Sequence, residues 1–550
     1  MALNPNDSLR RMINNGMQKG GPKYFFPTSK LEEVLDRKRI EATLEGVRLQ
    51  LPAQKQIVSK LTDFVTERAS PIFAGFDQEK LPIRYNFRQD NTLDFIIGGD
   101  VGGREIDAMF RGKGLMWDER DVEEFCKDRQ WEFTAPTFQK ARFRYDFAAG
   151  TALPFTTPPE ELGSGGSGRV EKVTIHRDHI DHTTLPLCQR SSLGEKTDPV
   201  IALKTLQGGT PEDREKAAEK EARNLEAVRK LESDNLIKAI AYYRIGKSHC
   251  FLFPIAENGN LWHFWAARIK EKEEGQSHRG DNNFLVWVFT QLVGLADSLV
   301  ELHGEVPNIR HGDLKPENIL CFQDGSCAVT RDASKPAGPS IRLVITDVGI
   351  AKRHKGPTQQ RAVTSTVVST TRYEPPEMSQ TRKGPIHSKL SRRYDVWSLG
   401  CILLEFLIWL LYDFEGLHDF TTALEDRFYQ SDKKGTHIHP IVSQWVKKIK
   451  NDQNCREESP FRDLVTLIEE RLLVVKVETL PGTLSEATES HRHTAQRFRK
   501  ILLRKTQHTT DKIAEIMGRR RVSAKDMREE LERILEDIKQ QRFEIKRASR

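Results

Sequence analysis

The segment IRHGDLKPENIL at Ile309–Leu320 constrains the fold more than any other part of the chain. The segment LVITDVGIAK follows it at Leu343–Lys352. Two further landmarks come later, STTRYEPPE at Ser369–Glu377 and YDVWSLGCILLEF at Tyr394–Phe406. One short motif arises in many folds, whereas four in a fixed order with set spacings do not. The chain is 550 residues long, which allows two to four domains at roughly 150 residues each.

A glycine-rich segment, LGSGGSGRV at Leu162–Val170, lies ahead of these landmarks and places Gly163, Gly165 and Gly168 in G-x-G-x-x-G spacing. Glycines let backbone amides approach phosphates closely. Plain flexible linkers have the same composition, so the glycines alone leave both interpretations open. The residues after Val170, EKVTIH, are typical of a strand, whereas a dinucleotide-binding turn leads into a helix. The sequence therefore favours a strand-turn-strand flap over phosphates.

Lys204 lies inside the apolar strand DPVIALKTL, with Ala202 two residues before it. A lysine in the interior of such a strand needs a partner of opposite charge. The charged segment PEDREKAAEKEARNLEAVRKL that follows is typical of a helix, and Glu221 shares one side of it with the apolar Leu225. Glu221 is therefore the predicted partner, with Glu226 as the alternative register. A surface ion pair is a common role for either carboxylate.

With these landmarks the chain resembles the eukaryotic protein kinase superfamily, serine/threonine type, over roughly residues 160–540. The resemblance implies an α+β, bilobal protein-kinase-like fold with a small β-rich lobe and a large helical lobe, preceded by a mainly helical N-terminal domain. It also implies transfer of the γ-phosphoryl group of ATP, with Mg²⁺, to Ser or Thr hydroxyls of protein substrates. The predicted domains are a flexible N-terminus at 1–28, the helical domain at 29–157, the catalytic domain at 158–540 and a basic tail at 541–550.

The resemblance assigns the chemistry to four residues of the two central landmarks. Asp313 corresponds to the catalytic-loop aspartate, which accepts or orients the proton of the attacking hydroxyl. Lys315 would steady the transferring phosphoryl group and favours Ser and Thr hydroxyls over Tyr. Asn318 and Asp347 would supply oxygen ligands to Mg²⁺.

The resemblance also assigns a nucleotide site. Lys204 would hold the α- and β-phosphates, with Glu221 fixing it. The glycines over the phosphates would be Gly163, Gly165 and Gly168. The residues around the adenine would be Leu162, Val170, Ala202, Phe253, Ala256 and Leu320.

Two further residues have implied structural roles. Asp395 would tie the central helix of the large lobe to the catalytic loop. Arg521 would be the distant partner of Glu377. Neither is predicted to be catalytic.

Three positions depart from the commonest pattern of the superfamily. Gly312 stands where an arginine usually pairs with a phosphorylated activation loop, which predicts an activity that does not need such phosphorylation. Val348 replaces an aromatic residue and Pro375 an alanine, and neither change removes a group that touches phosphate or metal. The nearby hydroxyls that remain open to modification, although a plain polar loop is the simpler interpretation, are Thr364, Ser365, Thr366, Ser369 and Thr370.

Two alternatives to an active protein kinase follow from the same residues. A pseudokinase or scaffold would bind nucleotide or partners through this fold without phosphoryl transfer, and Gly312 is its only support. A kinase of small molecules is disfavoured by the P-P-E and D-V-W-S-L-G landmarks, which belong to the large lobe of protein kinases.

Residues 1–157 carry no catalytic constellation. The patterns at Ser29–Val47 and in KQIVSKLTDFVTERA predict helices, and TALPFTTPPEE at Thr151–Glu161 predicts a joint to the catalytic domain. The segments QWEFTAP and LPF resemble N-terminal regions attached to kinases in filamentous fungi. The region is predicted to be either a helical cap or a docking or autoinhibitory module with a partner of its own.

The composition limits the partners and the compartment. The net charge of +7 is small for this length and predicts no nucleic-acid partner. The most apolar run, Cys401–Tyr412, is shorter than the roughly 20 residues that span a bilayer and contains Glu405, so it is predicted to be a buried helix and no membrane partner is expected. Seven scattered cysteines without a C-x-x-C pair predict an intracellular, cytoplasmic protein, with the nucleus left open.

Overall fold

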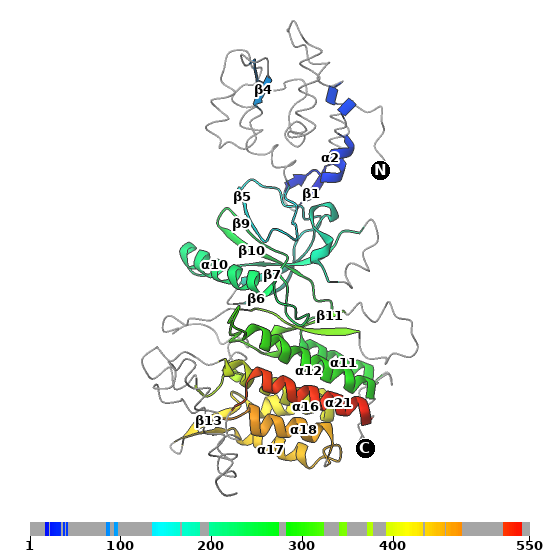
Figure 1. The fold of residues 1–550 in the computed structure, drawn as a ribbon, viewed down its shortest axis with the longest axis vertical. Helices are drawn as coiled ribbons and strands as arrows, with labels where there is room; N and C mark the ends of the chain where they lie inside the picture. Colours follow the sequence, from blue (N-terminus) through cyan, green and yellow to red (C-terminus); the bar gives the residue numbers. More distant parts are fainter. Residues whose placement is uncertain are drawn as a thin grey trace, which may run out of the picture. The chain divides into compact units, whose positions relative to one another are not determined.

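A computed structural model gives the fold (Figure 1). It describes residues 17–20, 23–34, 37–38, 40–41, 84–87, 93–96, 135–165, 168–186, 197–273, 282–323, 340–348, 371–377, 392–432, 435–456, 458–475 and 521–541. The chain divides into two compact units, residues 1–218 with 239–255 and residues 219–238 with 256–550. The first contains the β-rich lobe and the second the helical lobe, so the predicted α+β bilobal fold is confirmed.

The β-rich lobe is built on a six-stranded sheet with the order β5-β9-β10-β8-β7-β6. Neighbouring strands are antiparallel, except that β5 runs parallel to β9. The strands are β5 (Arg144–Phe147), β6 (Glu160–Gly165), β7 (Gly168–Thr174), β8 (Val200–Thr205), β9 (Ala241–Ile245) and β10 (Ser248–Pro254).

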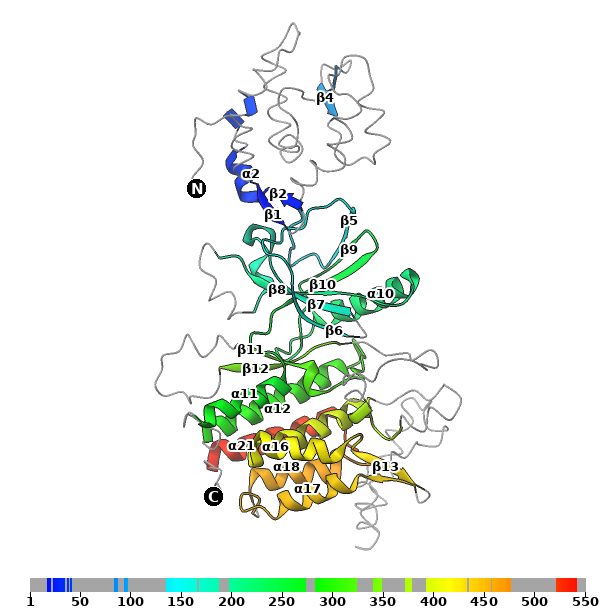
Figure 2. The ribbon, with the colours of Figure 1, turned by 180° about the vertical axis from the view of Figure 1, so that it is seen from behind.

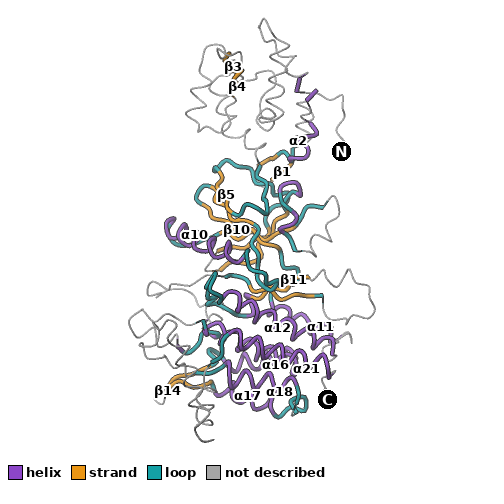
Figure 3. The backbone as a smooth tube through the Cα atoms, viewed as in Figure 1, coloured by secondary structure: helices purple, strands orange, loops and turns teal. Residues whose placement is uncertain are grey.

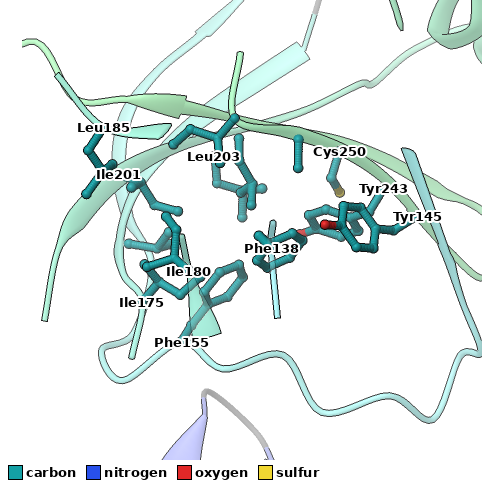
Figure 4. Close-up of a cluster of buried hydrophobic side chains, with 14 residues drawn as sticks. Phe138, Tyr145, Phe155, Ile175, Ile180, Leu185, Ile201, Leu203, Tyr243 and Cys250 are labelled. Carbon is teal, nitrogen blue, oxygen red and sulfur yellow. The ribbon is translucent and has the colours of Figure 1, made fainter. Parts of the chain in front are cut away.

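One face of this sheet forms the core of the lobe (Figure 4). Ile201 and Leu203 of β8 point into this core with Leu252 of β10. Side chains alternate between the two faces of a strand, so Ala202 and Lys204 lie on the opposite face. The core therefore fixes which residues of β8 are available for a ligand.

The core also includes side chains from ahead of the predicted domain boundary at residue 158. Phe138, Tyr145 and Phe155 are buried in the same cluster, and the Phe138 and Tyr145 rings meet edge to face at 5.2 Å. β5 adds a strand to the edge of the sheet. The lobe thus extends into the segment that the sequence analysis assigned to the helical domain, because these aromatic side chains need the sheet to cover them.

The segment predicted to be a flexible N-terminus contains ordered structure. Strands β1 (Gln18–Gly20) and β2 (Lys23–Phe25) form an antiparallel hairpin, followed by helix α2 (Thr28–Val34). Phe25 and Phe26 are buried, which gives this segment a reason to fold. Strands β3 (Arg84–Phe87) and β4 (Leu93–Ile96) also pair. The other predicted elements of residues 42–134, including the helix in KQIVSKLTDFVTERA, lie outside the described residues, so the helical character of that region stays a prediction.

Helix α10 (Pro211–Val228) follows β8 and is the charged helix predicted from the sequence. Thr210 and Asp213 cap its start: the Thr210 hydroxyl donates to the Asp213 carboxylate at 3.0 Å and accepts from the Asp213 amide at 3.2 Å. Acidic residues in the first turn favour a helix start. The helix carries Glu221 at a buried position.

The helical lobe is centred on α16 (Arg393–Leu424), which kinks at Asp413, where φ is 61°. Its first half, including the apolar run from Cys401 to Leu410, is buried as predicted. Helix α21 packs along α12, as both views show (Figures 1 and 2). The other elements of this lobe are α11 (Leu261–Glu273), α12 (Asn282–Leu302), β11 (Ile319–Gln323), β12 (Ile341–Ile345), β13 (Tyr429–Asp432), β14 (Gly435–Ile438), α17 (Pro440–Lys450), α18 (Pro460–Leu467) and α21 (Ala524–Gln541).

Two described helices are long and apolar enough to cross a membrane, α12 and α16. In α12, 61% of the most apolar window is buried inside the lobe, and in α16 94% is buried. Figure 3 shows both helices among other helices of the lobe. Most of the apolar surface of the two helices is therefore buried inside the lobe, and α16 has helices packed on several sides.

Candidate active site

The loop between α12 and β11 carries the predicted catalytic residues, and Asp395 at the start of α16 holds it. The backbone amides of His311 and Gly312 donate to its two carboxylate oxygens at 2.9 and 2.8 Å. Nε2 of His303 lies 2.8 Å from the same carboxylate. Asp395 is fully buried, and hydrogen bonds to a buried charge fix geometry strongly. The predicted role of Asp395 as the tie between helix and loop is confirmed.

The pKa of Asp395 lies below its ordinary value. Burial works in the opposite direction, but the hydrogen bond and charge of His303, with contributions from His311 and the Gly312 amide, outweigh it. The carboxylate therefore stays ionised and can hold the loop at neutral pH. Sequence reasoning missed His303, which stands just past the end of an apolar helix with no motif around it.

The backbone at Gly312 has a conformation that favours glycine. Its φ is 78°, in the left-handed region that side chains with a Cβ adopt only at a cost. A Cβ added there would meet the Nε atom of Arg310 at 3.6 Å, which is ordinary contact. Conformation, and not crowding, therefore distinguishes glycine from arginine at this position.

Asp313, Lys315 and Asn318 converge as the sequence analysis expected. Lys315 Nζ lies 3.3 Å from Asp313 Oδ2. Asn318 Nδ2 donates to the Asp313 carbonyl at 2.7 Å and to its Oδ2 at 3.2 Å. Asp313 and Lys315 are buried. An ionised carboxylate between a cation and an amide donor is held in one orientation, as a group that receives a proton must be.

The β11–β12 hairpin brings the two predicted metal ligands to one end. Ile319 pairs with Ile345, so the residue before β11 and the residues after β12 leave the hairpin together. Those residues are Asn318 and Asp347. The Thr346 amide donates to the Asn318 carbonyl at 2.9 Å and secures this closure.

Asp347 is held by its neighbours in a sparsely populated conformation. Its φ is 61°, which costs a non-glycine residue free energy and often marks a functional position. His311 Nε2 lies 2.7 Å from the carbonyl oxygen of Thr346, the preceding residue. Val348, the following residue, is buried. The valine thus fills the space as an apolar anchor and leaves the aspartate in place.

The residues at this end of the hairpin fit a magnesium ion. The amide nitrogen of Asn318 is committed to Asp313, so its oxygen is the atom left to act as a ligand. Within the described residues, no group of three or more His, Cys, Asp or Glu side chains is placed to hold a metal. Two protein oxygens with the remaining positions left to phosphates and water is the arrangement that Mg²⁺ favours.

The sheet of the other unit gathers the predicted nucleotide residues on one face. Val170 pairs with Lys204, and Ala202 pairs with Phe253. Directly paired residues, and residues two apart on a strand, share a face. These four side chains therefore lie together on the face opposite the hydrophobic core.

The glycine-rich segment contains β6 and β7, which pair antiparallel, as the sequence favoured. Gly168 has a φ of 148°, and a Cβ there would lie 2.4 Å from the Thr205 carbonyl oxygen. Gly163 and Gly165 have open space around them. Leu162 is 51% exposed, so it offers apolar surface to a ligand and not to the core.

The structure describes the positions of the remaining predicted nucleotide residues. Lys204 and Glu221 are both buried, and their pairing stays a prediction. Ala256 and Leu320 belong to the helical unit, where a bridge between Asn260 and Leu320 places Leu320 next to the start of α11. Their share in an adenine pocket also stays a prediction.

The end of the Ser369–Glu377 landmark is anchored on α16. The Tyr373 hydroxyl donates to the carboxylate of Glu405, with distances of 3.0 and 2.9 Å to its two oxygens. Ser398 Oγ donates to the Tyr373 carbonyl at 2.8 Å. Burial raises the pKa of Glu405 to about 8, against the charge of Arg372 and the Tyr373 hydrogen bond. Sequence reasoning noted Glu405 only as a charge in an apolar run and missed both contacts.

The predicted pair of Arg521 and Glu377 is confirmed. Arg521 Nη1 lies 2.7 Å from Glu377 Oε1, and its guanidinium also donates to the Arg393 and Val474 carbonyls. Arg521 is buried. The hydroxyl residues at 364–366 and 369–370, and Gly349, lie outside the described residues.

Comparison with known proteins agrees with this geometry. A family model described as protein kinase domain matches residues 190–546. Cysteine-rich receptor-like protein kinase 25 of Arabidopsis thaliana is 25% identical over 300 residues, which are 52% of this chain and 37% of that protein. Probable serine/threonine-protein kinase mps1 of Dictyostelium discoideum is 26% identical over 250 residues, 45% of this chain and 20% of that protein. The chain thus spans less than two fifths of the length of either relative, and the matched model begins after the glycine-rich segment.

Proposed function

Because the chain belongs to the protein kinase domain family, we propose that it is an active serine/threonine kinase that transfers the γ-phosphoryl group of ATP to protein hydroxyls. The convergence of Lys315 and Asn318 on the carboxylate of Asp313 carries this proposal. The pseudokinase or scaffold alternative does not require this arrangement, whereas phosphoryl transfer to a hydroxyl does.

The chemistry of the chain's own residues follows from their positions. Asp313 accepts or orients the proton of the substrate hydroxyl while Asn318 fixes the carboxylate orientation. Lys315 supplies positive charge next to Asp313, where charge builds up on the transferring phosphoryl group. Asp395 keeps the loop that carries Asp313 in place from within α16.

The nucleotide residues keep the roles that the family resemblance implies. Lys204 on the ligand face of the sheet would hold the α- and β-phosphates, and the Gly163, Gly165 and Gly168 flap would cover them. Asn318 and Asp347 would hold Mg²⁺. When bound, the ion neutralises charge on the phosphates and orients them.

Gly312 bears on regulation and not on chemistry. It removes the cation that usually binds a phosphorylated activation loop, while its amide still donates to Asp395. We propose that activity does not depend on phosphorylation of residues 364–370. Treatment with a phosphatase before assay is expected to leave the rate unchanged.

The partners required are proteins with Ser or Thr acceptors. The small net charge and the buried positions of the two apolar helices support an intracellular, cytoplasmic kinase without a nucleic-acid or membrane partner. The N-terminal domain, predicted at residues 29–157, would provide a docking surface for a further partner.

A radiolabel-transfer assay on a generic basic protein tests the proposed activity. Wild type is compared with Asp313→Asn. The variant is expected to lose kcat by about 100-fold or more, since this is the usual contribution of a positioned general base. Asp419→Asn, at an exposed position of α16, is the matched control and should retain activity. Equal background counts in wild type and Asp313→Asn would favour the pseudokinase alternative.

A further inference from the structure

The N-terminal segment Lys23–Val34 lies against the β-rich lobe at a short 3-10 helix, Arg177–His179. Phe25 is fully buried there. Its ring centroid is 5.9 Å from that of His176 and 5.5 Å from that of His179, with the rings near perpendicular at 78° and 90°. The two imidazoles, themselves 5.8 Å apart, therefore form a receptor for one phenyl ring.

Polar contacts close the same interface. The Thr28 amide donates to Nε2 of His179 at 3.3 Å. The Ser29 hydroxyl donates to the carboxylate of Asp178. Lys23 Nζ donates to the Gly150 carbonyl at 2.5 Å. Tyr24, between these contacts, is 51% exposed. Alternate residues of β2 thus face the lobe and the solvent.

The hydrogen bonds of His179 define its protonation state. Nδ1 lies 3.2 Å from the Pro136 carbonyl oxygen, which only accepts, so Nδ1 carries the proton. Nε2 receives the Thr28 amide and must therefore be unprotonated. A second proton on Nε2 would set its N–H against the Thr28 N–H and add a charge to a side chain that is buried away from water. Docking of the segment and protonation of His179 are consequently in conflict.

The surroundings reinforce this conflict. Burial lowers the pKa of His179 to about 4, with the Pro136 carbonyl and Asp178 opposing and His176 adding to the decrease. Burial also lowers the pKa of His176, against the attraction of two carboxylates. The charged side chains that face the two rings are Asp178 and Asp198, which favour protonation, and Lys30 and Arg177, which oppose it.

We propose that the His176–His179 site of the β-rich lobe binds the chain's own segment Lys23–Val34, and that protonation of His179 releases it. The surface thus tethers the N-terminal region to the lobe at neutral pH and frees it in acid. This role needs no phosphoryl transfer and stands apart from the proposed kinase activity.

The pH range follows from the two states of His179. Above about pH 6.5, the ordinary pKa of the imidazole, His179 is neutral in both the docked and the released form, so docking is strongest and independent of pH. Between about pH 6.5 and about pH 4 only the released form binds the proton, so each pH unit weakens docking up to about tenfold. Below about pH 4 both forms are protonated, so docking weakens no further.

Hydroxyl-radical footprinting of the full chain tests the proposal. Oxidation of Phe25, Tyr24 and Phe251 is measured by mass spectrometry at about pH 7.5 and about pH 5, each relative to the urea-unfolded chain, across the range where His179 should respond. Phe251 is fully buried in the sheet and reports global unfolding. At the higher pH we expect Phe25 to be protected and Tyr24 to be oxidised. At the lower pH we expect Phe25 to lose protection while Phe251 keeps it.

Two variants assign the effect to His179. His179→Gln keeps a neutral side chain and should hold Phe25 protected at both pH values. His182→Gln, at an exposed histidine of the next 3-10 turn, should respond as wild type does. The proposal is overturned if Phe25 is as exposed as Tyr24 at neutral pH, if its protection does not change with pH, if His179→Gln responds as wild type does, or if Phe251 is exposed together with Phe25.

Discussion

A single residue outside the catalytic loop, Asp395, holds the loop in place. Asp395 accepts two backbone amides and faces His303 while it is fully buried. Asp395→Ala would leave these donors unsatisfied inside the lobe, which costs about 3–5 kcal/mol of unfolding free energy for a broken buried pair. Urea unfolding measures this loss. Asp419→Ala, an exposed position on the same helix, should change the stability by less than about 0.5 kcal/mol.

Glu405 predicts a pH dependence of stability. Its pKa is about 8 in the folded lobe, whereas the unfolded chain ionises near the ordinary value of about 4.3. Between these values the unfolded state releases the proton and the folded state retains it. Stability therefore falls as pH rises from about 4.3 to about 8, by at most about 1.4 kcal/mol per pH unit.

Glu405→Gln removes this titration and keeps an acceptor for the Tyr373 hydroxyl. We expect the variant to gain stability relative to wild type as pH rises from about 5 to about 8. Urea unfolding across that range measures the difference. A difference that stays constant with pH would show that Glu405 ionises in the fold as it does in the unfolded chain.

Gly168 and Gly163 provide a matched pair in the flap. Gly168→Ala would force a Cβ to 2.4 Å from a backbone oxygen at a φ of 148°, whereas Gly163→Ala meets open space. We expect Gly168→Ala to lower the melting temperature by several degrees, at about 1–3 kcal/mol for a strained backbone. Gly163→Ala should melt as wild type does. Equal melting temperatures for all three proteins would contradict the close approach of Gly168 to the Thr205 carbonyl.

At the scale of elements, β5 decides where the lobe begins. It pairs with β9, and Phe138 and Tyr145 around it enter the core. Phe138→Ala should lower the unfolding free energy by about 3–5 kcal/mol, because a fully buried ring is lost. Leu162→Ala, at a largely exposed leucine, is the matched control for stability. Similar unfolding curves for the two would place Phe138 outside the core.

The same element decides how the N-terminal region is to be removed. A chain that lacks residues 1–157 loses β5 and three aromatic side chains of the core, so its inactivity would say nothing about regulation. A chain that lacks residues 1–133 keeps them. We expect the chain without residues 1–133 to melt cooperatively. The chain without residues 1–157 should lose cooperative melting. Calorimetry measures both.

For the whole molecule, the sequence predicted the contacts among residues that lie within its sequence motifs. Asp313, Lys315 and Asn318 converge as expected because one short loop carries them. Asp395 reaches that loop across more than 80 residues, and a family resemblance alone indicated it. The pairing of β6 with β7 followed from the β-branched residues after Val170, which favour a strand through local sequence alone.

The sequence could not predict what depends on distant partners. β5 is only four residues long, and its aromatic side chains fit a helical or a strand pattern equally until β9 lies beside them. Phe25 packs against His176 and His179, about 150 residues away in the chain. His303 and Glu405 carry no local motif, and their roles appear only when α12, α16 and the catalytic loop meet.

The central claim is that this protein phosphorylates Ser and Thr hydroxyls with ATP. The most direct measurement is tandem mass spectrometry of a mixed protein substrate after incubation with the full chain, Mg²⁺ and ATP carrying a heavy-oxygen γ-phosphoryl group, beside Asp313→Asn. The account predicts heavy phosphate on Ser and Thr with wild type and almost none with the variant, while both proteins still bind nucleotide. Nucleotide binding without heavy phosphate on any substrate residue in either sample would contradict it.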